Sequence, residues 1–298
     1  MDSITPRVDI AFKKIFGVEE NKDLLISLVN SIVSEEDQVE DLTLLNPYNP
    51  QNFKHEKLSI LDIKAKGQTG KRFNIEIQIS DEADYDKRAL YYWAKLYTEQ
   101  LKGGQDYALL SKAIGIHILN FTSILSETKY HNIFHITEKE TGHLYFKDLE
   151  LHTIELKKFS PDSTEELKDM AARIKSSLDI WVAFLTRHDL LDKRHLPPAL
   201  DNPTLKKALT VLDVMNFEPQ EREAYEDHLK WLRIEANTLK KYESKGFELG
   251  KAEGKAEGKA EEKIEVALEM LKENEPLPKI SKYTGLPASE LEKLKKKL

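Results

Sequence analysis

Cysteine is missing from the 298-residue chain, and so are long apolar runs and any excess of basic residues. Without cysteine the chain can form no disulfide, thiolate-bound zinc site or iron–sulfur cluster, and it has no cysteine nucleophile. No apolar run reaches the roughly 18–20 residues of a transmembrane helix. The N-terminal residues also lack the basic and apolar regions of a secretory signal. We therefore expect a cytoplasmic protein with no membrane partner.

The charge balance is acidic, because 52 acidic residues stand against 45 basic ones and give a formal net charge of -7. This balance argues against a protein that coats nucleic acid with a broad positive surface. It leaves room for a nucleic-acid enzyme with a local basic groove. The chain contains no G-x-x-x-x-G-K-[ST] sequence, which argues against a P-loop NTPase.

Apolar periodicity predicts elements of both kinds in the first half of the chain. We expect helices over 7–33, with a break around Gly17, and over 84–102, and strands over 58–66, 71–80, 113–121, 131–137 and 143–156. The polar segment 34–57 is expected to be mostly connection. The expected apolar stripe of the second helix comprises Leu90, Trp93, Ala94, Tyr97 and Leu101. This order of elements predicts an α/β fold built on a mixed sheet.

The second half of the chain has a helical pattern. We expect one helix from a cap at Asp162 or Ser163 to about His188, helices near 203–216 and 219–243, and a helix–turn–helix over 278–294. Residues 250–261 repeat Gly-Lys-Ala-Glu, and their charge pairs favour a solvated helix or a flexible arm. The expected domains are an α/β core (1–158), a helical extension packing on it (159–243), a charged helix or linker (244–263) and a small helical unit (264–298).

The hairpin over 58–80 admits two registers. A two-residue loop would place Asp62 opposite Ile75 and bring a carboxylate among core side chains. A three-residue loop, from Gln68 to Gly70, places Asp62 opposite Glu76 and keeps the apolar side chains on one face. Gly70 then takes the left-handed conformation that such loops commonly require. We therefore expect the three-residue register.

The polar face of this hairpin is the one feature that indicates a site. Asp62 and Glu76, opposed on neighbouring strands, would have Cβ atoms about 5 Å apart. Their charges would repel unless a cation such as Mg²⁺, which prefers carboxylate and water oxygens, lay between them. The Ile77 carbonyl could add a ligand, and Gln78 shares the face. A bound cation would lower the pKa of a water molecule and stabilise a phosphoryl group. The competing interpretation is an ordinary solvated sheet face, because alternating polar faces are common.

Segments along most of the chain carry a family resemblance. They are residues 9–17, 61–63, 75–78, 88–107 and 114–121, together with the GKAE-type tail and its small terminal helices. In this order they resemble the Rpn family of recombination-promoting nucleases, also described as transposases, in the PD-(D/E)XK nuclease superfamily. The resemblance implies a restriction-endonuclease-like core at 1–158 and a metal-dependent endonuclease that hydrolyses phosphodiester bonds of DNA. Mg²⁺ or Mn²⁺ would be the cofactor.

The resemblance also implies roles for individual residues. Asp62 matches the aspartate on the first strand of the metal hairpin, and Glu76 matches the acidic residue of the (D/E)XK element. Asp9 matches an acidic position at the start of the first helix that can complete the metal site. Arg88 and Tyr92 match the helix after the hairpin, whose polar face could touch phosphate.

Gln78 departs from the superfamily pattern, which often has lysine at this position. The Rpn group also has glutamine there, so the resemblance does not exclude activity. An amide carries no charge, and it can only position water or the metal shell by hydrogen bonding. Charge stabilisation must then come from the metal or from Lys64, Lys66 or Arg88.

The histidines have plainer interpretations than metal ligation. His117 lies in an apolar strand, which is typical of a core histidine. His131, His135, His143 and His152 lie in the second expected hairpin and are expected to be cross-strand surface residues. Metal ligation by either group stays a weaker alternative.

Two functions remain open. The first is a Mg²⁺-dependent DNA endonuclease in which Asp62, Glu76 and the Ile77 carbonyl hold the metal, Asp9 assists and Gln78 orients the attacking water. The second is a catalytically inactive, nuclease-derived protein that binds DNA or assembles with itself through the helical tail. A homodimer is compatible with the first, because paired sites would make double-strand cuts natural.

Overall fold

The computed structural model describes residues 4–46, 63–81, 84–160, 165–215 and 217–295. The chain forms two compact units, Met1–Leu232 and Arg233–Leu298. Among its described helices, none combines the length and the apolar character needed to span a bilayer.

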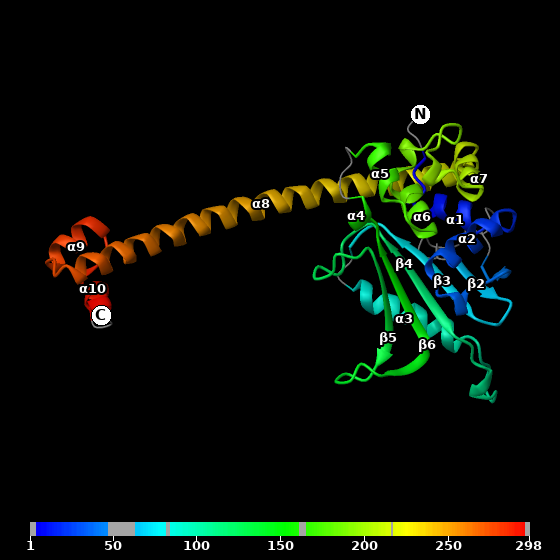
Figure 1. The fold of residues 1–298 in the computed structure, drawn as a ribbon, viewed down its shortest axis with the longest axis horizontal. Helices are drawn as coiled ribbons and strands as arrows, with labels where there is room; N and C mark the ends of the chain where they lie inside the picture. Colours follow the sequence, from blue (N-terminus) through cyan, green and yellow to red (C-terminus); the bar gives the residue numbers. More distant parts are fainter. Residues whose placement is uncertain (1–3, 47–62, 82–83, 161–164, 216, 296–298) are drawn as a thin grey trace. The chain divides into compact units, whose positions relative to one another are not determined.

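The first unit is built on a sheet with six strands in the described residues (Figure 1). The strands are β1 (Leu42–Leu44), β2 (Ile63–Gly67), β3 (Arg72–Gln78), β4 (Ala113–Leu119), β5 (His131–Thr137) and β6 (Leu144–Glu155). They lie in the order β1-β2-β3-β4-β6-β5, with β3–β4 and β4–β6 parallel and the other pairs antiparallel. The predicted α/β fold with a mixed sheet is confirmed. Strand β1 lies in a segment that was expected to be mostly connection.

The β2–β3 hairpin has the predicted three-residue register over its described residues. Ile63 pairs with Ile75, and Lys66 pairs with Arg72. Gly70 has a φ of 90°, a left-handed conformation that glycine adopts without steric cost. The apolar residues of both strands therefore share one face, and their polar neighbours share the other.

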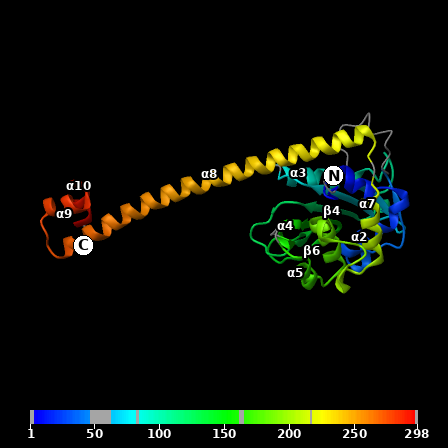
Figure 2. The same ribbon diagram turned by 90° about the horizontal axis from the view of Figure 1, so that it is seen from above.

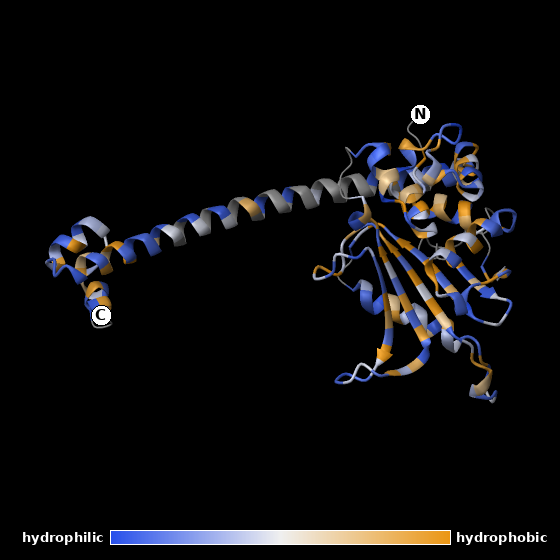
Figure 3. Ribbon diagram, in the orientation of Figure 1, coloured by the Kyte–Doolittle hydropathy of each residue, from blue (hydrophilic) through white to orange (hydrophobic). Residues whose placement is uncertain are grey.

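Helices cover both faces of the sheet. Helices α1 (Asp9–Phe16) and α2 (Lys22–Ile32) pack on the face that carries the apolar residues of β2 and β3, which we call the core face. Helix α3 (Tyr85–Thr98) packs on the opposite face, the α3 face. Strand β4 is buried along its whole length because it lies under helices on both sides. The alternation of polar and apolar residues along the strands is visible in Figure 3.

The buried stripe of α3 differs from the predicted one. It consists of Tyr85, Ala89, Trp93 and Leu96, whereas Leu90 is 51% exposed. Only Trp93 is common to the expected stripe and this fully buried one. The apolar residues of this helix are spread widely around its axis, so periodicity did not determine which side of the helix packs against the sheet.

Helices after the sheet extend the core. They are α4 (Leu156–Phe159), α5 (Leu167–Arg173), α6 (Ser177–Arg187) and α7 (Pro203–Asp213), and short 3-10 turns lie at Glu19–Asn21, Glu35–Asp37, Tyr107–Leu109, His188–Leu190 and Pro198–Leu200. The single helix expected up to His188 is divided, because Ser176 and Asp179 form a capping box that starts α6. The predicted caps Asp162 and Ser163 lie outside the described residues.

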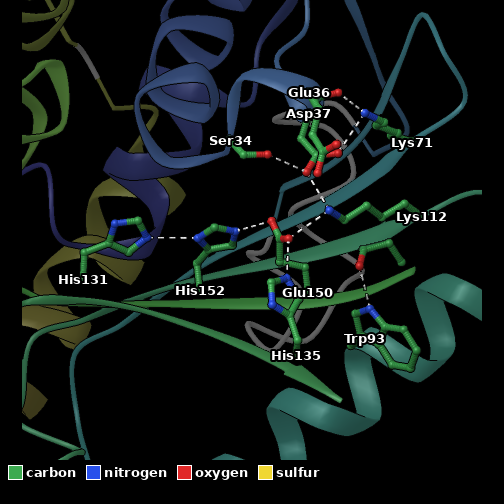
Figure 4. A network of polar contacts seen from close by, with 11 residues as sticks. Ser34, Glu36, Asp37, Lys71, Trp93, Lys112, His131, His135, Glu150 and His152 are labelled. Carbon is green, nitrogen blue, oxygen red and sulfur yellow. Dashed lines mark hydrogen bonds and ion pairs between the residues drawn. The ribbon is translucent and has the colours of Figure 1, made fainter. Parts of the chain in front are cut away.

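A buried network of charged side chains lies on the core face (Figure 4). We call it the Asp37–Glu150 network; its members are Ser34, Asp37, Lys71, Lys112, His131, His135, Glu150 and His152. Lys112 Nζ lies 2.6 Å from Asp37 and 2.8 Å from Glu150. His152 bonds Glu150 at 2.8 Å and the His131 ring across the strand pair at 2.9 Å. His152 is thus a cross-strand residue as predicted, but the prediction that it lies at the surface was wrong, since it is fully buried.

The long helix α8 (Pro219–Lys272) crosses the boundary between the two units and includes the whole GKAE repeat (Figure 2). The repeat is therefore helical. Beyond it, α9 (Leu277–Thr284) and α10 (Ala288–Lys295) form the expected helix–turn–helix, and Gly285 ends α9 with a φ of 71°. A small core of Ala267, Leu271, Ile280 and Leu291 holds these helices together.

Candidate active site

Glu76 lies on β3 with its side chain on the α3 face, between groups from two neighbouring elements. Its Oε1 atom lies 3.3 Å from Nη2 of Arg88 on α3. Its Oε2 atom lies 3.7 Å from Nδ1 of His117, the residue paired with it on β4. The two oxygens of one carboxylate thus face different partners, and the side chain is only 13% exposed.

Gln78 follows on the same face of β3 and also contacts Arg88. Its Oε1 atom accepts a hydrogen bond from Arg88 Nη2, and its Nε2 atom donates to the Ser80 carbonyl at 3.2 Å. The Arg88 guanidinium lies over the Tyr85 ring, 5.5 Å from its centroid. One cation therefore contacts both Glu76 and Gln78, and its position is fixed by the first turn of α3.

Asp9, the first residue of α1, is coupled electrically to this group. Burial and the negative charge of Glu76 raise the pKa of Asp9 to about 7, although the charge of Arg88 acts in the opposite direction. Loss of solvation by burial is the larger of the two causes, and the charge of Glu76 adds to it. The structure thus brings Glu76, Gln78 and Arg88 into contact, and the charges of Glu76 and Arg88 both act on Asp9.

Several buried polar atoms beside Glu76 have no hydrogen-bond partner in the part of the chain that the structure describes. They are Glu76 Oε2, both ring nitrogens of His117 and the Tyr85 hydroxyl. The Tyr85 and His117 rings meet edge to face with centroids 5.8 Å apart, and burial raises the pKa of the Tyr85 phenol above its ordinary range. Buried polar groups are normally paired, so an unpaired set indicates a place for a further group. We call Glu76, Gln78, Tyr85, Arg88 and His117 the α3-face cluster.

Only some of the metal ligands predicted from the sequence lie within the described residues. Asp62 lies outside the described residues, and the Ile77 carbonyl stays a predicted ligand. Within the described ranges, no group of three or more histidine, aspartate or glutamate side chains is arranged to hold a metal ion. The residues present fit a hard cation in one respect: the buried Oε2 atom of Glu76 is an anionic oxygen that accepts no described hydrogen bond.

The predicted substrate contacts divide between two places. Lys64 lies 3.5 Å from Glu99, just after the last residue of α3. Glu99 is eleven residues from Arg88, about 16 Å along the helix axis, so Lys64 is not held in the α3-face cluster. Tyr92 follows Arg88 by one helical turn and is half-buried, with its ring 5.7 Å from that of Tyr91.

Two members of the cluster, His117 and Tyr85, were not predicted as site residues. The prediction of His117 as a buried strand histidine is confirmed, but its position opposite Glu76 depends on the register between parallel strands. Tyr85 lies at the first position of α3, and its spacing of three residues from Arg88 was the available signal.

A family model described as PD-(D/E)XK nuclease family transposase matches residues 6–242. This range contains the whole α3-face cluster, Asp9 and all six strands described above. No curated protein and no solved structure matches the chain. Because the matched range covers well over half of the 298 residues, the chain belongs to the PD-(D/E)XK nuclease family transposases.

Proposed function

We propose that the protein is a Mg²⁺-dependent DNA endonuclease, also able to use Mn²⁺, that hydrolyses phosphodiester bonds in the cytoplasm. Family membership supports a nuclease-like function, and nucleases of this family generally use divalent metals. The observation that carries the proposal is the contact of Arg88 on α3 with both Glu76 and Gln78 on β3. The charge of Glu76 also acts on Asp9 of α1.

The metal would be held by Asp62, Glu76 and the Ile77 carbonyl, with Asp9 assisting. The described hairpin register supports this set, because Ile63 pairs with Ile75 and one further pair in that register would place Asp62 opposite Glu76. The raised pKa of Asp9 also supports it, since a nearby cation would favour the carboxylate form. A bound Mg²⁺ would lower the pKa of its water and stabilise the charge that develops on the phosphoryl group.

Arg88 would supply the positive charge that Gln78 lacks. Gln78 holds the Arg88 guanidinium through its amide oxygen, beside the carboxylate that the metal needs. Guanidinium donors match the geometry of phosphate oxygens. Gln78 would also orient the attacking water, while Lys64 and Tyr92 would contact DNA outside the cluster. A homodimer with two such sites could cut both strands.

Cleavage of supercoiled plasmid DNA with Mg²⁺ or Mn²⁺ tests this proposal. We expect the wild-type protein to nick or linearise the plasmid. Asp62→Ala and Glu76→Gln should each reduce the rate by at least about 100-fold, because each removes a charge that holds the metal. Glu140→Gln, which neutralises an exposed carboxylate in the β5–β6 turn, is the matched control and should cut like the wild type.

Two results would contradict the proposal. Unchanged cleavage by Asp62→Ala or Glu76→Gln would show that the carboxylates do not hold a catalytic metal. DNA binding without any metal-dependent cleavage by the wild type would favour a nuclease-derived binding or assembly protein instead.

A further inference from the structure

We propose that His117 is a positioning residue for the nuclease reaction, which it serves by donating a hydrogen bond from Nδ1–H to Oε2 of Glu76 and so orienting the metal-binding carboxylate. This inference rests on the proposed function of Glu76 as a metal ligand. It assigns a role to a strand residue that would otherwise be an unexplained buried imidazole.

The backbone fixes the two side chains opposite each other. Glu76 and His117 are directly paired on the parallel strands β3 and β4, so both side chains leave the sheet on the α3 face. The distance from Nδ1 to Oε2 is 3.7 Å, about 0.5–1 Å longer than a hydrogen bond. A small rotation of either side chain closes such a gap, and hydrogen bonds in catalytic sites commonly tighten when ligands bind.

The alternative partners for these atoms are few. His117 is 2% exposed, and in the described chain neither of its ring nitrogens, nor Oε2 of Glu76, has a hydrogen bond. The Tyr85 ring meets the imidazole edge to face, and its hydroxyl is the other buried group here without a described hydrogen bond. A buried donor and a buried acceptor without other partners gain most from pairing with each other.

Gly115 provides the space in which the imidazole lies. It precedes His117 by two residues and therefore shares its face of β4. A Cβ atom at Gly115 would come within 3.0 Å of His117 Nε2 and 2.7 Å of a Leu151 methyl group. The strand thus has a glycine where a side chain would push the imidazole out of its present position.

Together with Arg88, His117 would hold the carboxylate plane of Glu76 from two sides. Arg88 faces Oε1 from the helix, and His117 faces Oε2 from the next strand. A carboxylate has about four lone-pair sites, so each oxygen keeps one for a cation. Partners that orient metal ligands typically change metal affinity 10–100-fold when they are removed.

Three substitutions at position 117 test this role in the full-length protein. His117→Asn places an amide N–H near the position of Nδ1, His117→Gln places it near Nε2, and His117→Phe removes both. Mn²⁺ and Mg²⁺ affinities are measured by isothermal titration without DNA, with unfolding curves to check that each variant folds. We expect His117→Phe to weaken metal binding about 10–100-fold, His117→Gln to weaken it similarly, and His117→Asn to restore at least half of the loss on a logarithmic scale.

The outcomes separate this inference from the proposed function. Equal metal affinity in the Asn and Gln variants would overturn the Nδ1 hydrogen bond, even if the Phe variant did not fold. Electron spin-echo spectra of bound Mn²⁺ that show a directly coordinated nitrogen in the wild type, lost in His117→Asn, would overturn it in favour of direct ligation. If Glu76→Gln leaves metal binding unchanged, the proposed metal site fails and the inference fails with it.

Discussion

The two faces of one sheet carry two buried polar groups that differ in how completely they are paired. In the Asp37–Glu150 network, Glu150 is bonded by Lys112, His135 and His152, and the two carboxylates face two lysines. In the α3-face cluster, Glu76 has one oxygen without a described hydrogen bond and a second carboxyl nearby at Asp9. A fully paired network stabilises the fold. An incompletely paired group of buried polar side chains has a place for a further partner.

The pKa directions express the same difference. Burial alone would raise the pKa of Glu150, but hydrogen bonds from His152, Lys112 and His135 hold it far below the ordinary range. Burial raises the pKa of Asp9 to about 7, and the neighbouring Glu76 adds to the effect. The network therefore keeps Glu150 charged by itself, whereas Asp9, beside the cluster, would be fully charged at neutral pH only with an added cation nearby.

The largest expected effect comes from neutralising one carboxylate in each region. Glu150→Gln should lower the free energy of unfolding by about 3 kcal/mol, because it leaves the buried Lys112 without part of its compensating charge. Glu76→Gln should change it by less than about 1 kcal/mol, because the loss of the Arg88 contact is offset by relief of repulsion with Asp9. Urea unfolding at pH 7 measures both. Equal losses in the two variants would remove the distinction between a structural network and a ligand site.

The hairpin was predictable because its register is determined locally. The three-residue loop follows from the alternation of apolar residues and from one glycine, Gly70, and the structure has that loop. The pairing of Glu76 with His117 was not predictable, because the two strands are parallel and are joined through α3. No turn fixes the register of such a pair, and both strands read as continuous or alternating apolar runs.

The burial of particular side chains could also not be predicted from the sequence. Leu90 was expected in the buried stripe of α3 and is exposed, while Tyr85 is buried. His152 was expected at the surface and is buried, because Glu150 and His131 satisfy both of its ring nitrogens. Periodicity shows that residues at a given spacing share a face of a helix or strand, whereas tertiary packing decides which of those faces is buried.

The second-largest effect concerns the charge beside Gln78. Arg88→Ala should reduce plasmid cleavage about 10–100-fold, because it removes a phosphate-stabilising cation from the cluster. Adding Gln78→Lys to this variant should restore the cleavage rate about tenfold, since the new lysine returns a positive charge beside Glu76, now from β3 instead of α3. Lys139→Ala, which removes an exposed cation from the β5–β6 turn, is the control and should cut like the wild type. No recovery in the double variant would show that the position of the charge on α3 is itself required.

A third prediction concerns the stability of the Asp37–Glu150 network in acid. Burial and the neighbouring His152 lower the pKa of His131 to about 4, from an ordinary value of 6.5. Between these two pH values the unfolded chain binds a proton that the folded chain excludes, so stability falls as pH decreases from about 6.5 to 4. His131→Asn should remove on the order of 2 kcal/mol of this loss. His143→Asn, at an exposed position in the β5–β6 turn, should keep the wild-type slope; the same slope in His131→Asn would contradict the assignment.

The smallest expected effect has the opposite sign and concerns Asp9, beside the candidate active site. The pKa of Asp9 is raised from 3.8 to about 7, so its contribution to stability is present below pH 3.8 and is lost as pH rises through 7. Asp9→Asn should therefore raise the free energy of unfolding on the order of 1 kcal/mol at pH 8, and little at pH 4. Mn²⁺ should remove this advantage at pH 8, because a bound cation stabilises the Asp9 carboxylate but has no charge to pair with in the variant. If Asp9→Asn is equally stabilising with and without Mn²⁺, the bound metal does not stabilise the Asp9 carboxylate, and Asp9 is not part of the metal site.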